Sequence, residues 1–201
     1  MFFKKLALIV VAAFALAGCI SETLDPVTDA ALKPRDKKLL ASAPYLNHKP
    51  SEGWLRHLVD YSGKEAPGTV VVDTERKFLY LVQEKGKAYR YGVTVGEEGL
   101  SWRGIAKVGR KTEWPQWVPT PDILKRMPEL PKHVGPGPHN PMGARALYLY
   151  QGNKDTLFRI HGTNQPEYIG QAISSGCIRM LNEDVIDLYN RVPVGATVVV
   201  I

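Results

Sequence analysis

Three short runs of β-branched and aromatic residues, separated only by tight turns, constrain the fold of this chain more than any other feature. The runs lie at residues 69–73, 78–82 and 88–96, and the third has the alternating pattern of a half-buried strand. The charged turns between them are too short to hold a helix. Consecutive strands joined by such turns pair antiparallel. The sequence therefore predicts an antiparallel meander that opens a mainly β domain.

The remaining strand pattern and a few helical signals extend this domain to the C-terminus. Two further runs at 146–150 and 156–160, joined by a polar turn, predict a hairpin, and residues 197–201 predict a closing strand. Asn182, followed by two acids and a periodic apolar face, predicts the N-cap of a helix. We therefore expect one domain, residues 68–201, that is mainly β with small helices.

Tryptophan and proline dominate residues 97–143, which we predict to be mostly irregular. A short helix fits residues 122–127, with a polar cap before it and a proline after it. A long irregular segment within a compact domain is usually functional. Two roles stay open for Trp114 and Trp117: they plug the core, or they line a proline-stiffened wall of a groove for an extended substrate.

The first residues have the pattern of an export signal. Two lysines precede an apolar run at residues 6–16, and small residues follow up to Cys19. Such a run is too short for a stable membrane span. Residues 16–19 resemble the lipobox of bacterial lipoproteins, in which the signal peptide is cleaved before a lipid-bearing cysteine. We therefore expect residues 1–18 to be a lipoprotein signal peptide and Cys19 to be lipidated, with an ordinary cleaved signal as the alternative.

Residues 19–67 are predicted to be a tether between the lipid anchor and the domain. This segment contains scattered prolines and charges, and its one amphipathic stretch, residues 51–61, predicts a helix. Whether part of the segment packs on the domain stays open. Because Ile20 follows the cysteine where Asp would favour the inner membrane, we expect a periplasmic protein anchored at the outer membrane.

The charge of the chain favours some partners over others. It has 26 Lys and Arg against 20 Asp and Glu, a formal net charge of +6, without a concentrated basic run. A modest positive charge suits an anionic neighbourhood such as a cell wall or a membrane surface, and no motif favours nucleic acid. Cysteine and histidine do not occur at zinc-ligand spacings, so no metal or other cofactor is expected.

One cysteine and one histidine near the C-terminus carry the candidate chemistry. With Cys19 lipidated, Cys177 has no disulfide partner in an oxidising compartment, so it forms an intermolecular bridge or is a reactive thiol. His161 lies sixteen positions earlier, at a strand end beside Gly162, and Cys177 follows Gly176. A thiol is activated by a neighbouring histidine. We therefore predict Cys177 as nucleophile, His161 as its base, and the amides of Gly176 and Cys177 as an oxyanion hole.

Two motifs give the chain a resemblance to a known family. Residues 161–164 are His-Gly-Thr-Asn, and residues 174–179 are Ser-Ser-Gly-Cys-Ile-Arg. They resemble the active-site signature of the L,D-transpeptidase (YkuD-like) catalytic domain family, and the likeness covers residues 68–201. The resemblance implies a β-sandwich-type domain whose cysteine attacks the bond between the diamino acid and D-Ala in a peptidoglycan stem tetrapeptide. D-Ala leaves, and an amine on a neighbouring peptide or an outer-membrane lipoprotein accepts the acyl group.

The resemblance also implies roles for individual residues. Cys177 matches the nucleophile and His161 the general base, and the backbone carbonyl of Gly162 orients the imidazole. Ser175 stands where many members have a histidine, and Arg179 either holds a substrate carboxylate or ties down the loop. The expected substrate-binding residues are Ser174, Ser175, Arg179, Thr163, Asn164, Trp114 and Trp117.

Other activities stay open from the sequence. The same thioester could pass to water, which would make the protein an L,D-carboxypeptidase or an amidase. The scaffold could also bind the cell wall without catalysis, although His161 and Cys177 are both intact. A penicillin-binding D,D-transpeptidase is disfavoured, because the sequence has no Ser-x-x-Lys and no Lys-Thr-Gly motif.

Overall fold

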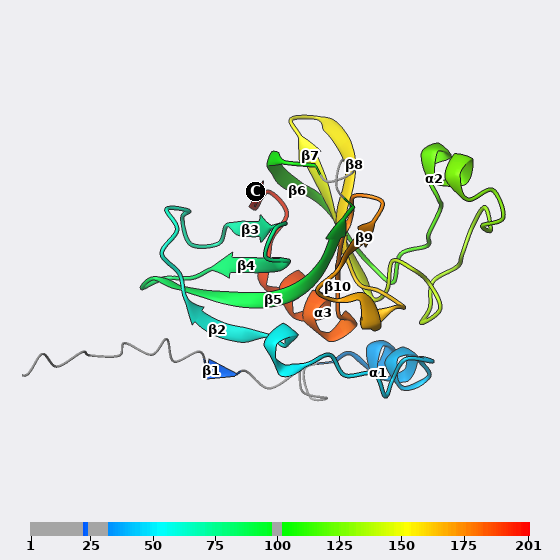
Figure 1. Ribbon diagram of the computed structural model, residues 1–201, viewed down its shortest axis with the longest axis horizontal. Coiled ribbons are helices and arrows are strands. Elements are labelled where there is room, and N and C mark those ends of the chain that lie inside the picture. The colour runs from blue at the N-terminus through cyan, green and yellow to red at the C-terminus, as the bar shows by residue number, and fades with distance from the viewer. Residues whose placement is uncertain (1–21, 24–31, 98–101) are drawn as a thin grey trace, which may run out of the picture.

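The computed structural model describes residues 22–23, 32–97 and 102–201. The predicted signal peptide, residues 1–18, and the predicted lipidation site, Cys19, lie outside the described residues. The mainly β prediction is confirmed, since strands form most of the domain and the helices are few and short (Figure 1). No helix within the described ranges is both long and apolar enough to cross a membrane.

The predicted meander forms one part of the sheet. β3 (Val70–Asp73), β4 (Phe78–Val82) and β5 (Lys87–Gly96) pair antiparallel in sequence order. Its first strand is buried along most of its length, as its unbroken run of valines requires. The boundaries of these strands agree with the sequence pattern to within a residue.

A ten-residue strand, β6 (Gly104–Glu113), corrects the expectation that residues 97–143 are mostly irregular. A buried alanine and a buried valine alternate in it with more exposed neighbours, which is the pattern of a strand. Because lysine and arginine fill several outward positions, the alternation is weak in the sequence. β6 lies between β7 (Arg145–Gln151) and β11 (Thr197–Val200) and pairs antiparallel with both.

The remaining pairings close the sheet on itself. β7 forms the predicted hairpin with β8 (Lys154–His161), and β8 pairs in parallel with the short β10 (Ile178–Met180). The strand order is β5-β10-β8-β7-β6-β11-β3-β4, and β4 pairs again with β5. A second short strand, β9 (Ala172–Ser174), pairs with the end of β5. The sequence did not indicate β9 or β10.

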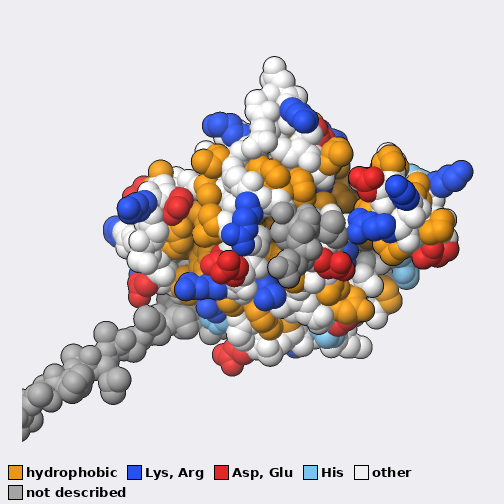
Figure 2. Space-filling view, turned by 45° about the horizontal axis from the view of Figure 1, so that its top comes forward, with side chains coloured by type: hydrophobic (Ala, Val, Ile, Leu, Met, Phe, Trp, Pro, Cys, Tyr) orange, Lys and Arg blue, Asp and Glu red, His pale blue; other side chains and the backbone are white. Residues whose placement is uncertain are grey.

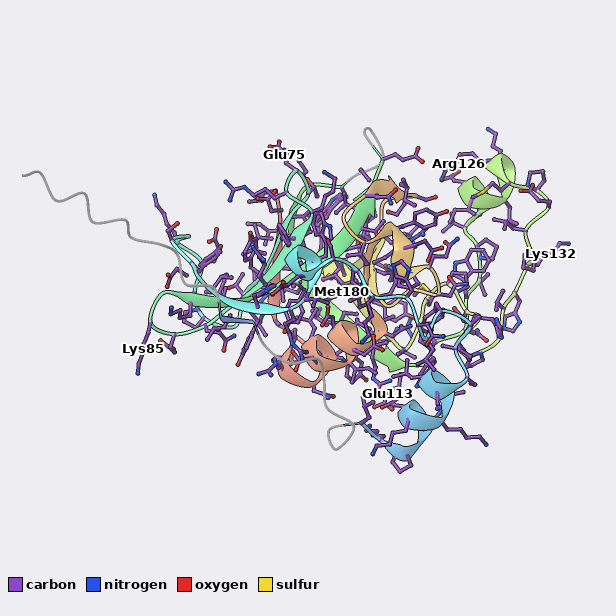
Figure 3. All side chains as sticks on the ribbon, turned by 60° about the horizontal axis from the view of Figure 1, so that its bottom comes forward. Glu75, Lys85, Glu113, Arg126, Lys132 and Met180 are labelled. Carbon is purple, nitrogen blue, oxygen red and sulfur yellow. The ribbon has the colours of Figure 1, made fainter. Side chains whose placement is uncertain are left out.

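The main hydrophobic core takes side chains from strands all round this closed sheet and from α3 (Asn182–Arg191). Met180, which lies near the middle of the molecule in Figure 3, is one of its fully buried members. Each large apolar side chain buried in this way stabilises the fold by roughly 1.5–3 kcal/mol. The core thereby fixes the ends of β8 and β10, where His161 and Cys177 lie.

Much of the expected tether packs on the domain. Residues 32–67 include α1 (Pro34–Ala41), the 3₁₀ turn η2 (Glu52–Trp54) and β2 (His57–Asp60), which pairs with β5 and with β1 (Glu22–Thr23). The helix predicted for the amphipathic stretch that ends at residue 61 is wrong. Leu58 and Val59 of this stretch instead lie in β2, because β5 offers backbone partners that an isolated short helix would lack.

Asp36 fixes α1 to the domain through a buried ion pair. Its carboxylate accepts hydrogen bonds from Arg145 Nη1 and Nη2, at 3.0 and 2.7 Å, and from Trp114 Nε1 at 2.7 Å. All three residues are at most 2% exposed. At the start of the helix, Lys33 pairs with Glu113, which Figure 3 labels beside α1. The helix is thus tied to the end of β6 and the start of β7.

A lobe formed by residues 115–143, here called the α2 lobe, projects from the sheet (Figure 1). It contains the predicted short helix, α2 (Pro121–Arg126), whose N-cap is Thr120; the Thr120 hydroxyl accepts a hydrogen bond from the Ile123 amide. Figure 3 places Lys132 at the outer edge of the lobe, away from the sheet.

Candidate active site

His161 is the last residue of β8, and only 5% of its surface is exposed. A hydrogen bond of 2.6 Å joins its Nδ1 to the carbonyl oxygen of Gly162. Because a carbonyl oxygen can only accept, Nδ1 carries the hydrogen, and the lone pair is on Nε2. This is the contact expected of a carbonyl that orients the imidazole as a base.

Asn182 holds the backbone on both sides of this histidine. Its Oδ1 accepts a 2.8 Å hydrogen bond from the Ala144 amide. Its Nδ2 donates to the Thr163 carbonyl and to the Tyr45 hydroxyl, both at 2.7 Å. The side chain therefore ties the turn after β8 to the turn before β7 and to the N-terminal segment.

The prediction that Asn182 caps α3 is wrong. The N-cap is Leu181, and the Asn182 side chain is turned inward to the bonds just described. A Cβ atom at Gly162 would collide with Asn182 Oδ1, so the close approach requires glycine at that position. The Asn182 amide therefore positions the backbone beside His161 and does not serve the start of the helix.

Cys177 lies in a tight loop between β9 and β10. Gly176 has φ +112°, which strongly favours glycine. The Ser174 hydroxyl donates to the Cys177 carbonyl at 2.5 Å and accepts from the Gly176 amide at 3.2 Å. Cys177 itself is a free, half-buried thiol, and its Sγ lies 4.0 Å from the Leu157 carbonyl oxygen. Ser174 thus closes the loop that presents the thiol.

The parallel pairing of β10 with β8 brings the predicted pair together. Arg179 lies opposite His161 in this register, so Cys177, two residues earlier, lies beside Arg159. Side chains two residues apart on a strand share one face. All four line a single groove of about 560 Å³, whose opposite wall is made by apolar side chains of the α2 lobe, among them Trp117.

Both members of the pair are neutral in the resting site. Burial and the nearby charge of Arg179 together lower the pKa of His161 to about 3, against the opposing effect of the Gly162 hydrogen bond. Burial raises the pKa of Cys177, although the charges of Arg159 and Arg179 favour the thiolate. The site therefore holds a thiol and an imidazole at neutral pH, and a nucleophilic attack by Cys177 would require transfer of its proton.

The predicted substrate-binding residues divide into two groups. Those that line the groove are Ser174, Ser175, Arg179 and Trp117. Thr163 is buried and takes part in the backbone contacts around Asn182, and the Asn164 side chain donates to the His139 carbonyl of the α2 lobe at 2.9 Å. Thr163 and Asn164 thus shape the walls around the site.

Trp114 corrects the expectation that both tryptophans line the groove. Its ring is 2% exposed and packs in a small core with Leu40, Ala144 and Ile186, while Nε1 donates to Asp36. It therefore plugs the core, and its neighbour in the motif, Trp117, lines the groove.

One of the two predicted oxyanion donors is already engaged, since the Gly176 amide donates to the Ser174 hydroxyl. The oxyanion hole at Gly176 and Cys177 stays a prediction. Within the described ranges, no three His, Cys, Asp or Glu side chains gather as ligands for a metal ion.

Among the groove residues that were not identified as site residues from the sequence are Arg110, Tyr148 and Arg159. Arg159 had a usable signal, because it lies two residues before His161 on a predicted strand and therefore faces the same way. Tyr148 lies on another predicted strand, whereas Arg110 lies on β6, which the sequence did not indicate. Placing them in the groove requires the register of three strands.

Comparison with known proteins assigns the chain to a family. The L,D-transpeptidase catalytic domain family matches residues 67–201. A putative L,D-transpeptidase from the ATP synthase subunits region of Fuscovulum blasticum is 37% identical over 135 residues, which cover 66% of this chain and 68% of that protein. The probable L,D-transpeptidase ErfK/SrfK of Escherichia coli K12 is 37% identical over 142 residues, 67% of this chain and 44% of that protein. The matched region is thus less than half the length of the E. coli relative.

Solved structures share the fold. A Brucella melitensis protein described as a probable carnitine operon oxidoreductase, caia, is 46% identical, with a TM-score of 0.51 over 80% of this chain and 100% of that chain. An L,D-transpeptidase from Mycobacterium smegmatis is 15% identical, with a TM-score of 0.52 over 88% of this chain and 87% of that chain. The second likeness concerns the fold alone. Because the family match spans residues 67–201 and includes both His161 and Cys177, the chain belongs to the L,D-transpeptidase catalytic domain family.

Proposed function

We propose that this protein is a peptidoglycan L,D-transpeptidase that uses Cys177 as nucleophile and His161 as general base. The observation that carries the proposal is the groove in which parallel strands bring both side chains together, with the histidine tautomer fixed by Gly162. Membership of the family supports the substrate class that we propose, a stem tetrapeptide with a terminal D-Ala.

The first half-reaction transfers the acyl group to the enzyme. As Sγ attacks the carbonyl carbon of the diamino acid, Nε2 of His161 takes the thiol proton. The carbonyl oxygen becomes an oxyanion, for which the Cys177 amide is the candidate donor. The tetrahedral intermediate then collapses: the C–N bond to D-Ala breaks, the imidazolium returns the proton to the leaving nitrogen, and a thioester remains on Cys177.

Arg179 supports this step through its charge. It lines the groove two residues after Cys177, and its one side-chain hydrogen bond within the described part of the chain is a 3.4 Å contact with Gln165, which leaves its guanidinium accessible to a substrate carboxylate. A carboxylate placed there would offset the positive charge that contributes to the low pKa of His161. Substrate binding would thereby raise the pKa of the imidazole and strengthen it as a base.

The second half-reaction passes the acyl group to an amine. The amine nitrogen attacks the thioester carbonyl while His161 accepts its proton, a new amide bond forms, and the thiol is restored. The acceptor is a neighbouring stem peptide or an outer-membrane lipoprotein. Water in place of the amine would give L,D-carboxypeptidase or amidase activity, and a scaffold without chemistry would bind wall peptides only.

Product analysis separates these activities. The full chain is incubated with purified tetrapeptide muropeptides, and the products are analysed by mass spectrometry. Crosslinked dimers indicate an amine acceptor, and tripeptides alone indicate water. We expect dimers, and we expect both products to disappear in Cys177→Ala and in His161→Gln. An unchanged profile in Cys177→Ala, or neither product from the unaltered protein, would refute the proposed mechanism.

We further propose that the protein is exported to the periplasm and anchored by lipid on Cys19, as its lipobox-like residues 16–19 indicate. Metabolic labelling with a palmitate analogue tests this directly. We expect labelled protein in the membrane fraction, and loss of both label and membrane association in Cys19→Ser. Label that persists in Cys19→Ser would contradict the assignment of the lipidation site.

A further inference from the structure

Three arginines and no acidic side chain line the groove of about 560 Å³, as far as the described residues show. They are Arg110, Arg159 and Arg179. The outer surface differs, because Figure 2 shows Lys, Arg, Asp and Glu side chains intermixed on the lobe at the right of the view. A groove lined by one sign of charge attracts ligands of the opposite sign. The groove is therefore built for an anionic ligand.

The three arginines are not equivalent. Arg159 is already paired, since its Nη1 and Nη2 donate to Asp155 at 2.7 and 2.9 Å. Arg179 is the arginine beside Cys177, and the proposed mechanism gives it a role in the reaction. Arg110 forms no ion pair with any described Asp or Glu, and its side chain is exposed to solvent. It is thus a charged group in the groove to which neither the described residues nor the proposed chemistry gives a carboxylate partner.

Tyr148 holds Arg110 in place for binding. The guanidinium carbon lies 3.6 Å from the centroid of the Tyr148 ring, and Nη1 lies 3.4 Å from the Thr112 hydroxyl. The ring itself is only 8% exposed, and Arg159 contacts it at 4.5 Å. Stacking on a fixed ring reduces the conformational freedom that a long side chain loses when it binds a ligand. The planar guanidinium remains free to bind a carboxylate with two hydrogen bonds.

The register of the sheet sets the distance between Arg110 and the nucleophile. Arg110 lies opposite Tyr148, and Tyr148 lies opposite Arg159, beside which Cys177 is placed. Three strand spacings separate β6 from β10, directly before which Cys177 lies, and together they span about 14 Å. An extended peptide covers that distance with about four residues. A donor peptide whose scissile carbonyl lies at Cys177 can therefore extend to Arg110.

We propose that Arg110, held by Tyr148, is a specificity-determining residue that binds a free carboxylate of the donor peptide at a distance from the scissile bond. The inference rests on the proposed function and deepens it, because it gives the acyl donor a required charge. A stem peptide contains such carboxylates on its acidic residue and on the far centre of its diamino acid. Conversion of the recognised carboxylate to a carboxamide would remove the ion pair.

A donor series tests the proposal. One tetrapeptide donor keeps every carboxylate, and the others carry a single carboxamide, one position at a time. Each is assayed with the full chain, with Arg110→Gln, and with Lys107→Gln. Lys107 is a matched control, because it lies on the same strand but outside the groove, where its Nζ contacts the Gly195 carbonyl. Melting temperatures verify that each variant is folded. If Arg110→Gln is not folded, Arg110→Lys replaces it as the test variant.

We expect one carboxamide to lower kcat/KM of the unaltered protein by about five- to tenfold, mainly through KM, which is the range of a partly covered ion pair. Arg110→Gln should lower kcat/KM for the donor with every carboxylate to a similar degree. This variant should then convert that donor and the carboxamide donor with equal kcat/KM. Lys107→Gln should keep the full discrimination, and Arg110→Lys should keep part of it. Equal carboxylate-to-carboxamide ratios in the unaltered protein and in Arg110→Gln, at every position, would overturn the proposal.

Binding measurements distinguish a failure of this inference from a failure of the proposed function. The same donors are titrated against Cys177→Ala, with and without Arg110→Gln. If no donor is converted but binding shows a carboxylate preference that requires Arg110, the transpeptidase proposal fails and this inference stands. If donors are converted but neither turnover nor binding shows an Arg110-dependent preference, only this inference fails. If the donors neither react nor bind, both fail.

Discussion

The buried ion pair between Asp36 and Arg145 gives the sharpest test of how the N-terminal segment supports the active site. Asp36→Ala would leave the Arg145 guanidinium without its carboxylate in a site that is 1% exposed, and would also remove the acceptor of the Trp114 indole. Removing one partner of a buried ion pair typically costs about 3–5 kcal/mol. That is a large fraction of the roughly 5–15 kcal/mol by which domains are stable.

The loss should be visible in thermal unfolding of the full chain. For a domain of this size a loss of about 3–5 kcal/mol lowers Tm by roughly 6–20 °C. Lys33→Ala is the matched control, because it removes the half-exposed pair with Glu113 at the start of the same helix. Such surface pairs contribute about 0–1 kcal/mol, so Tm should fall by no more than about 4 °C.

The double variant Asp36→Ala, Arg145→Met distinguishes an uncompensated charge from the loss of helix contacts. If the stranded guanidinium causes the loss, removing it as well should restore part of the stability, so the two effects should not add. The structure also predicts that Asp36→Ala affects the kinetics of the reaction, because Arg145 is linked to the active site: its carbonyl accepts a 3.0 Å hydrogen bond from the Gly162 amide. A Tm for Asp36→Ala within 2 °C of the unaltered protein would refute the docking of α1 described above.

Three further outcomes follow from the site. Because the pKa of His161 is lowered to about 3, kcat/KM should stay nearly flat from pH 7.5 to pH 5, whereas with a base of the ordinary pKa of 6.5 kcat/KM would fall about 30-fold over that range. Arg179→Gln should move the acid limb of the pH profile to higher pH. An acid limb centred near pH 6.5 in the unaltered protein would contradict this. Asn182→Ala should lower kcat by about tenfold or more with a smaller change in KM, because two backbone groups beside the histidine lose their hydrogen-bond partner. An unchanged kcat in the folded variant would exclude the positioning role. Trp114→Phe should lower Tm with little change in KM, whereas Trp117→Ala should raise KM with little change in Tm, and the reverse pattern would show that the two tryptophans were assigned incorrectly.

The sequence was sufficient where local pattern and structure coincide. The meander of β3, β4 and β5 could be predicted because apolar runs and short turns repeat within a span that allows only one pairing. The juxtaposition of His161 and Cys177 could be predicted only through their motifs, since the parallel pairing of β8 and β10 joins distant segments and β10 has three residues. No periodicity can be recognised in so short a strand.

Where the sequence failed, a long-range contact decided the outcome. Asn182 has the residue type and the following acids of an N-cap, yet its amide bonds Ala144 and Thr163, which no local pattern indicates. Trp114 and Trp117 belong to one motif, but only the first meets a buried carboxylate, from Asp36. In each case a polar group buried during folding had to find a partner, and the partner was far away in the chain.

Long-range contacts also extend the folded domain toward the N-terminus, beyond the start of the family match. The family match begins at residue 67, but Asp36 and Tyr45 contact the scaffold on which His161 is mounted. A chain cut at residue 67 would bury Arg145 without its carboxylate and leave the Asn182 amide without its hydroxyl partner. Residues 32–67, which the sequence suggested as part of a tether, therefore belong structurally to the same folded unit as residues 68–201.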